Sequence, residues 1–123
     1  MSSEVTSLID RYCAVWNEPE PERRKALLEA VWADRATYTD PRADTKGVDE
    51  LLAHIATVRA GRPGARIVRT TAVDLHHGLV RFGWRVVEAD GTPLPEGIDI
   101  TLLTPDSERI ERIIGFFGPM TPI

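Results

Sequence analysis

The spacing of apolar residues changes once along the chain, near residue 65, and this change most constrains the fold. Before it, apolar side chains recur every three or four positions, as on one face of an α-helix; after it they recur at every second position, as along a β-strand. A helical first half followed by hairpins predicts an α+β domain. Because the sheet must cover one apolar face with the helices, we expect a cone-shaped, curved antiparallel sheet wrapped around three N-terminal helices.

Three segments of the first half carry the helical spacing. The first ends at the Asn17-Glu18-Pro19 turn, and its apolar stripe comprises Val5, Leu8, Ile9, Tyr12, Val15 and Trp16. The second begins at Pro21 and directs Leu27, Leu28, Val31 and Trp32 toward the core. The third begins near Gly47 and ends at Gly61, with the stripe Val48, Leu51, Leu52, Ile55 and Val58. A short β-prone run, 36–39, lies between the last two and stops at Asp40-Pro41.

Four β-prone runs fill the second half: 67–75, 80–86, 97–103 and 109–117. They are separated by turn signals at His76-His77-Gly78, Asp90-Gly91 and Pro105-Asp106-Ser107. In the second run, the apolar residues share one face of the strand: Val80, Phe82, Trp84 and Val86.

The composition excludes several classes of protein. The 123 residues predict one domain, 1–123. The net charge of −4, without a Lys/Arg cluster, argues against nucleic acid or an anionic membrane as partner. There is neither a secretory signal nor an apolar run of about 18 residues, so we expect a cytoplasmic protein. The lone Cys13 excludes an internal disulfide and a multi-thiolate zinc site, and no motif calls for a metal or cofactor.

Two strands carry apolar residues on both faces, which raises the question of an oligomer. Ile98, Ile100 and Leu102 alternate with Asp99, Thr101 and Leu103, and in the last strand Ile110 and Ile114 oppose Ile113 and Phe117. A sheet with one face on the helices and a second apolar face needs cover, so we expect a homodimer through the outer face. A monomer with scattered surface apolar residues is the alternative.

Three polar residues occupy positions where apolar ones are expected. Tyr12 lies in the middle of the first helical stripe, so its hydroxyl points toward the core. Asp99 interrupts the most apolar strand, where it either faces water or enters a desolvated cavity that raises its pKa. Asp40 ends the first short strand. Each position also has a plain structural explanation, and spacing alone does not decide between that explanation and a shared site.

Four stretches together resemble a known superfamily: Arg11-Tyr12-Cys13-Ala14-Val15-Trp16-Asn17, Trp32-Ala33-Asp34-Arg35-Ala36-Thr37-Tyr38-Thr39-Asp40-Pro41, Gly97-Ile98-Asp99 and Phe116-Phe117-Gly118. Their order resembles the nuclear transport factor 2-like superfamily, in particular its SnoaL-like and ketosteroid isomerase-like branch, over essentially the whole chain. The resemblance implies a cone-shaped α+β barrel with a deep pocket, commonly dimeric, and a single SnoaL-like domain.

The resemblance also implies site residues. Ketosteroid isomerases use a general base and two donors that stabilise an enolate oxygen. The resemblance implies that Asp40 corresponds to this base, and Tyr12 and Asp99 to the two donors. The substrate would be a small, hydrophobic, ring-containing molecule, and the reaction an isomerisation or a polyketide cyclase-like ring closure. The remaining pocket residues would bind substrate: Trp16, Tyr38, His54, Phe82, Trp84, Val86 and Phe117.

Other activities within the superfamily stay open. A dehydratase would use His54 and Tyr38 with a carboxylate. An epoxide hydrolase relay would need an inward arginine, whereas Arg81 and Arg85 lie opposite the apolar face of their strand. The same fold also serves as a non-catalytic ligand-binding or association module.

Overall fold

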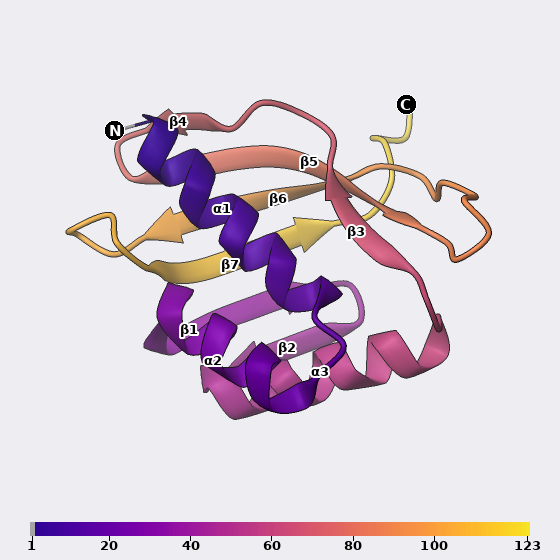
Figure 1. The fold of residues 1–123 in the computed structure, drawn as a ribbon. Helices are drawn as coiled ribbons and strands as arrows, with labels where there is room; N and C mark the ends of the chain where they lie inside the picture. Colours follow the sequence, from indigo (N-terminus) through magenta and orange to yellow (C-terminus); the bar gives the residue numbers. More distant parts are fainter. Residues whose placement is uncertain (1) are drawn as a thin grey trace.

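Residues 2–123 are described by a computed structural model, and they form three helices and a seven-stranded sheet (Figure 1). The helices are α1 (Ser2–Asn17), α2 (Pro21–Val31) and α3 (Gly47–Gly61). The strands are β1 (Trp32–Asp40), β2 (Ala43–Lys46), β3 (Arg66–Arg69), β4 (Asp74–His76), β5 (Leu79–Val87), β6 (Gly97–Leu103) and β7 (Ile110–Phe116). The predicted α+β class is confirmed, with all three helices before residue 62.

The sheet is mixed, which corrects the expectation of an antiparallel sheet. Its strand order is β2-β1-β7-β6-β5-β3, with β4 also paired to β5. All neighbours are antiparallel except β1 and β7, which run parallel. A two-residue period identifies the faces of a strand but says nothing about its partner's direction, so this pairing between distant segments was invisible in the sequence.

The helices lie against one face of the curved sheet, with α1 crossing in front of β5, β6 and β7 in Figure 1. Helix α3 packs on β1 and β2, and α1 packs on α2 and β3. The entire predicted stripe of α1 is buried: Val5, Leu8, Ile9, Tyr12, Val15 and Trp16. The core between these layers therefore forms from the residues that carried the helical and alternating patterns.

The prediction for Leu27 is wrong, because this side chain on α2 is 37% exposed. The buried face of α2 instead runs through Arg24, Leu28 and Val31. The Arg24 guanidinium is accommodated there because Nε and Nη2 donate to the carbonyl oxygens of Glu18 and Pro19, at 2.9 and 3.2 Å. Those hydrogen bonds compensate for the burial of the charged Arg24 side chain, which lies one turn before Leu28 on the buried face of α2. Leu27 lies beside this face.

The predicted strand 67–75 is two strands, β3 and β4, separated by Thr70–Val73. The break arises at Gly83 of β5. Its carbonyl accepts from the backbone N–H of Thr70 at 2.9 Å, but its N–H donates to the hydroxyl oxygen of Thr71 at 2.8 Å. A side chain thus replaces a backbone carbonyl as acceptor, and the ladder is interrupted although each residue has strand propensity.

Candidate active site

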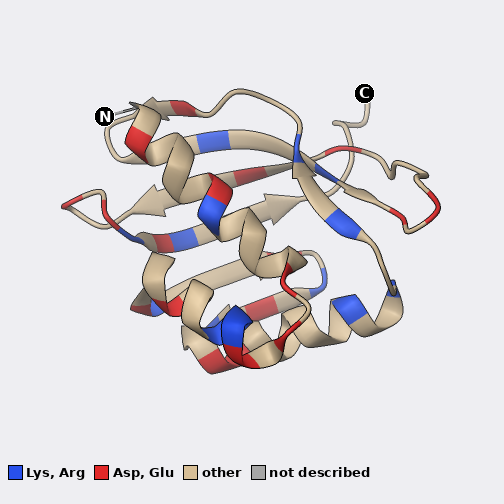
Figure 2. Ribbon diagram, viewed as in Figure 1, with Lys and Arg blue, Asp and Glu red and all other residues tan. Residues whose placement is uncertain are grey.

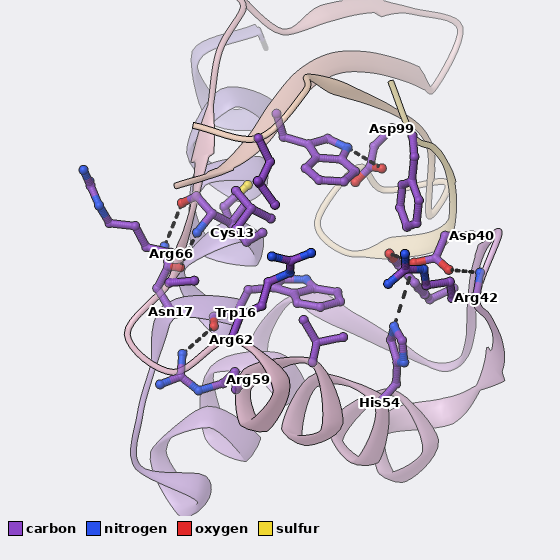
Figure 3. Close-up of a pocket in the computed structure, with 18 of the residues that line it drawn as sticks. Cys13, Trp16, Asn17, Asp40, Arg42, His54, Arg59, Arg62, Arg66 and Asp99 are labelled. Carbon is purple, nitrogen blue, oxygen red and sulfur yellow. Dashed lines mark hydrogen bonds and ion pairs between the residues drawn. The ribbon is translucent and has the colours of Figure 1, made fainter. Parts of the chain in front are cut away.

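A cavity of about 390 Å³ lies between the helices and the curved sheet (Figure 3). All ten residues that the sequence nominated line it, although they come from five different elements and the segment after β7: Tyr12, Trp16, Tyr38, Asp40, His54, Phe82, Trp84, Val86, Asp99 and Phe117. A cavity of this size suits a small organic molecule. The fold therefore brings the nominated residues together; their chemical roles are a separate question.

Strand register turns Asp99 into the cavity. Asp99 pairs with Phe82 on β5 and with Gly115 on β7, so the three residues form one row on the inner face. Asp99 is 5% exposed, and its Oδ1 accepts a hydrogen bond of 2.9 Å from Nε1 of Trp84. Burial raises the pKa of Asp99 to about 7, against the lowering effect of the Trp84 bond and with a smaller raising effect of the Asp40 charge. Near neutral pH this carboxyl group is thus substantially protonated.

Gly115 leaves the space that the Asp99 carboxyl group occupies. A Cβ atom at this position would lie 2.9 Å from Asp99 Oδ1 and 3.4 Å from Cβ of Asp40. The first distance is shorter than van der Waals contact allows. A residue without a side chain is therefore required for the two aspartates to approach the same part of the sheet.

Tyr12 lines the same cavity and carries a buried hydroxyl group. The residue is 2% exposed, and its hydroxyl has no hydrogen-bond partner among residues 2–123. The Trp16 indole is near the hydroxyl but outside hydrogen-bonding geometry. Burial, followed by the nearby Asp99 charge, raises the pKa of Tyr12 well above its ordinary value. The phenol is therefore neutral and has a proton to donate.

Asp40 is held in place by three neighbours. Its Oδ2 accepts a hydrogen bond of 2.5 Å from the Tyr38 hydroxyl, and its Oδ1 accepts one of 2.7 Å from the backbone N–H of Arg42. Nε2 of His54 lies 3.8 Å from Oδ2. The Asp40 side chain is only 4% exposed. Two hydrogen bonds fix the orientation of the carboxylate but do not use all of its lone pairs, so it keeps capacity to accept a proton.

Aromatic rings form the cavity walls on two sides. Trp16, Tyr38 and His54 contact one another with ring centroids 5.6–5.9 Å apart. On the other side, Trp84 meets Phe117 edge to face at 5.8 Å. Such walls favour flat, ring-containing molecules, because rings pack on them in offset or edge-to-face geometry.

Sequence reasoning missed several further lining residues, above all four arginines: Arg42, Arg59, Arg62 and Arg66. One signal was present. His54, Val58 and Arg62 follow one another at intervals of four, so Arg62, the first residue after α3, continues the helix face that points His54 at the cavity. Cys13 also lines the cavity, and burial raises the pKa of its thiol to about 12, so it is neutral. Across residues 2–123, no group of three or more His, Cys, Asp or Glu side chains is placed to hold a metal ion.

Comparison with known proteins identifies the family. A crystal structure of a SnoaL-like family protein from Agrobacterium tumefaciens, a candidate isomerase, is 32% identical to this chain. The alignment covers 95% of this chain and 99% of that one, with a TM-score of 0.89. The chain belongs to the SnoaL-like family. This confirms the resemblance seen in the four sequence stretches, and the fold is of the nuclear transport factor 2-like type.

More distant structures share the SnoaL-like fold and show the fold alone. A candidate polyketide cyclase from Sinorhizobium meliloti is 14% identical, with 94% of this chain and 98% of that chain covered and a TM-score of 0.71. A candidate ketosteroid isomerase from Kribbella flavida is also 14% identical, with 99% of this chain and 83% of that chain covered and a TM-score of 0.65. A scan of family models gave no match. A search of curated proteins gave none either. None of the described helices has the length and hydropathy of a membrane-spanning segment.

Proposed function

We propose that this SnoaL-like protein is an enzyme that moves a proton at a carbon atom next to a carbonyl group. In this proposal, Asp40 is the general base, and Tyr12 and Asp99 donate hydrogen bonds to the enolate oxygen that forms. One observation carries it: two buried oxygen acids whose pKa values are raised by burial, one of them without a hydrogen-bond partner among residues 2–123, line the same cavity as an ordered carboxylate. Removing a proton beside a carbonyl requires this combination of a base and oxyanion donors.

The donors suit an oxyanion because their surroundings are dry. The Tyr12 hydroxyl is buried and unpartnered, so no protein acceptor competes for its proton. Asp99 has one oxygen occupied by Trp84, which leaves the other to carry a proton and donate it as a hydrogen bond. A carboxylic acid kept neutral by burial can stabilise negative charge on a substrate oxygen. In a site with little water, each such donor is worth about 10²–10³ in kcat.

The proposal is tested with cyclic β,γ-unsaturated ketones, whose conversion to conjugated enones is followed by ultraviolet absorbance. We expect turnover by the native protein and its loss in Asp40→Asn, which cannot accept the proton. Asp44→Asn is the matched control, because Asp44 is exposed on β2 and is absent from the cavity lining. Full activity of Asp40→Asn would show that Asp40 is not the base.

A second activity, dehydration of a β-hydroxy ketone, is favoured by the position of His54. Its Nε2 lies 3.8 Å from Oδ2 of Asp40, which also accepts the hydrogen bond from the Tyr38 hydroxyl. In this reaction Asp40 would take the proton on the carbon beside the carbonyl, and protonated His54 would donate a proton to the departing hydroxyl, which leaves as water. His54→Gln distinguishes the two reactions. It should lower dehydration by about 10²-fold, the scale of general acid catalysis, and affect isomerisation far less.

The alternative from a different class is a ligand-binding module without catalysis. Such a module would bind ring compounds in the same cavity, but its affinity for them would not depend on acid–base groups. A naphthol, whose hydroxyl imitates an enolate oxygen, separates these cases. An enzyme of the proposed kind binds it more weakly after Tyr12→Phe, whereas a purely apolar binding site does not.

A further inference from the structure

The cavity is a positively charged region of an acidic protein. Its lining contains four arginines but only two acidic residues, Asp40 and Asp99, although the chain as a whole has a net charge of −4. Figure 2 shows basic residues along the end of α3 and along β3, and Arg59, Arg62 and Arg66 from this part of the chain line the cavity. Because the pKa of Asp99 is about 7, this aspartate is only partly charged at neutral pH, so the two aspartates together carry less than two negative charges. An uncharged ring compound would leave this excess without a function.

Three of the four arginines are occupied or point elsewhere. Nη1 of Arg59 donates to the carbonyl oxygen of Trp16 at 2.8 Å. Arg62 forms an ion pair with Glu88. The side chain of Arg66 extends away from the cavity in Figure 3. These residues contribute to the local potential, but none of them offers an unengaged guanidinium group to a ligand.

Arg42 differs from the other three. It belongs to the turn between β1 and β2, and its backbone N–H is fixed by the bond to Oδ1 of Asp40. Its guanidinium carbon lies 5.9 Å from the centroid of the Phe117 ring, in cation–π contact. Within residues 2–123, the Arg42 guanidinium has no acidic partner and no hydrogen bond. Figure 3 shows the side chain reaching back over the cavity beside Asp40.

We propose that Arg42 binds a carboxylate group of the substrate, which is therefore a ring-containing carboxylic acid in its anionic form. One unengaged guanidinium group matches one negative charge, and its planar fork of donors fits a carboxylate with two parallel hydrogen bonds. Stacking on Phe117 orients the fork without using its N–H groups. The rings then lie between the aromatic walls, and the reacting carbonyl group lies at the Tyr12 and Asp99 end. The inference rests on the proposed function in assuming that the cavity is the substrate site.

The test compares two fluorescent ligands, 2-naphthol and 6-hydroxy-2-naphthoate, which share the rings and the hydroxyl and differ only in the carboxylate. We expect the native protein to bind the hydroxynaphthoate about tenfold more tightly, an advantage that falls with added salt. Arg42→Gln should abolish the advantage and leave naphthol affinity nearly unchanged. Arg66→Gln tests whether the advantage arises from the general positive potential around the cavity. This change should reduce the advantage by about twofold or less, because the Arg66 charge points away.

Several results would overturn this proposal. It is wrong if the native protein does not bind the hydroxynaphthoate, if the two ligands bind equally, or if the advantage survives Arg42→Gln. It is also wrong if Arg66→Gln has as large an effect as Arg42→Gln. If Tyr12→Phe removes the advantage, the carboxylate occupies the oxyanion site and not Arg42. None of these binding measurements requires turnover. If the binding tests contradict the role of Arg42, the enone assay still tests Asp40 as the base. If the enone assay shows no turnover, the ratio of the two ligand affinities still tests Arg42.

Discussion

Trp84 reaches Asp99 across the face of Gly97. On the sheet, Trp84 is the direct cross-strand partner of Gly97, two residues before Asp99 on β6. Because Gly97 has no side chain, the indole lies over it and Nε1 meets Asp99 Oδ1 at 2.9 Å. The position of one cavity acid is thus set by a tryptophan on the next strand and by the glycine beneath it.

This relationship predicts that Gly97→Ala is severely destabilising. The new Cβ would lie 2.5 Å from Cζ2 of Trp84 and 2.8 Å from the carbonyl oxygen of Phe116. Displacing the indole should cost about 2–3 kcal/mol, the scale of overpacking a core, and should break the bond to Asp99. Urea unfolding measures the free energy, and the near-ultraviolet circular dichroism reports the indole. Gly61→Ala is the control, because a Cβ there meets nothing within 4 Å; an equal loss in both variants would contradict the prediction.

The raised pKa of Asp99 predicts that stability depends on pH. An ordinary aspartate has a pKa of 3.8, and that of Asp99 in the folded protein is about 7, so between these values the folded state holds a proton that the unfolded state lacks. The free energy of unfolding therefore falls as pH rises from about 4 to about 7, by on the order of 4 kcal/mol at most, and then levels off. Urea titrations at several pH values check this. The fall should largely disappear in Asp99→Asn; the same slope in that variant would assign it to other groups.

Turnover should follow the same titration. If protonated Asp99 is a donor to the enolate oxygen, kcat/KM falls as pH rises through about 7, because kcat/KM reports the pKa values of the free enzyme. In Asp99→Asn the amide still donates a hydrogen bond but no longer titrates, so a lower kcat/KM with no fall near this pH is expected. The pH profile of the enone assay provides the measurement. A native profile that is flat from pH 6 to about 8 would contradict a role for the Asp99 proton.

Tyr12→Phe should separate stability from activity. The buried hydroxyl has no hydrogen-bond partner among the described residues 2–123, so removing it should leave the free energy of unfolding unchanged or raise it by about 1 kcal/mol. The same change should lower kcat about 10²-fold by removing one oxyanion donor. Thermal unfolding and the enone assay measure the two effects. A large loss of stability would instead indicate that the hydroxyl has a structural partner.

The outer face of the sheet leads us to propose a homodimer. Ile98 and Phe116 are direct cross-strand partners on this face and are 38% and 61% exposed. A second copy would cover this exposed apolar surface. Sedimentation of Ile98→Lys/Phe116→Lys should give the mass of one chain, whereas the native protein should give twice that mass. Leu27→Lys is the matched control, since Leu27 is 37% exposed on α2. A native protein that sediments as one chain would rule out the dimer.

By itself, the sequence determined the helices, most of the strands and most of the inward-facing residues, with Leu27 as an exception. This was possible because periods of 3.6 and 2 are local, so Tyr12 and Phe82 revealed their buried faces without knowledge of their neighbours. The resemblance carried by four short stretches then identified the family. The break at Thr71 escaped prediction, because it depends on a hydrogen bond to Gly83, twelve residues away.

Only the tertiary structure decided what meets in the cavity. The parallel pairing of β1 with β7 and the inner row containing Asp99 and Gly115 depend on contacts between distant segments, which a residue pattern does not encode. Asp40 is the last residue of β1, yet its neighbour His54 comes from α3. In the sequence, Arg42 is an ordinary turn residue. In the structure, the ring of Phe117, seventy-five positions later, orients the Arg42 guanidinium group over the cavity. Local periodicity assigns a residue to a face, but the packing of distant elements determines which charges share that face.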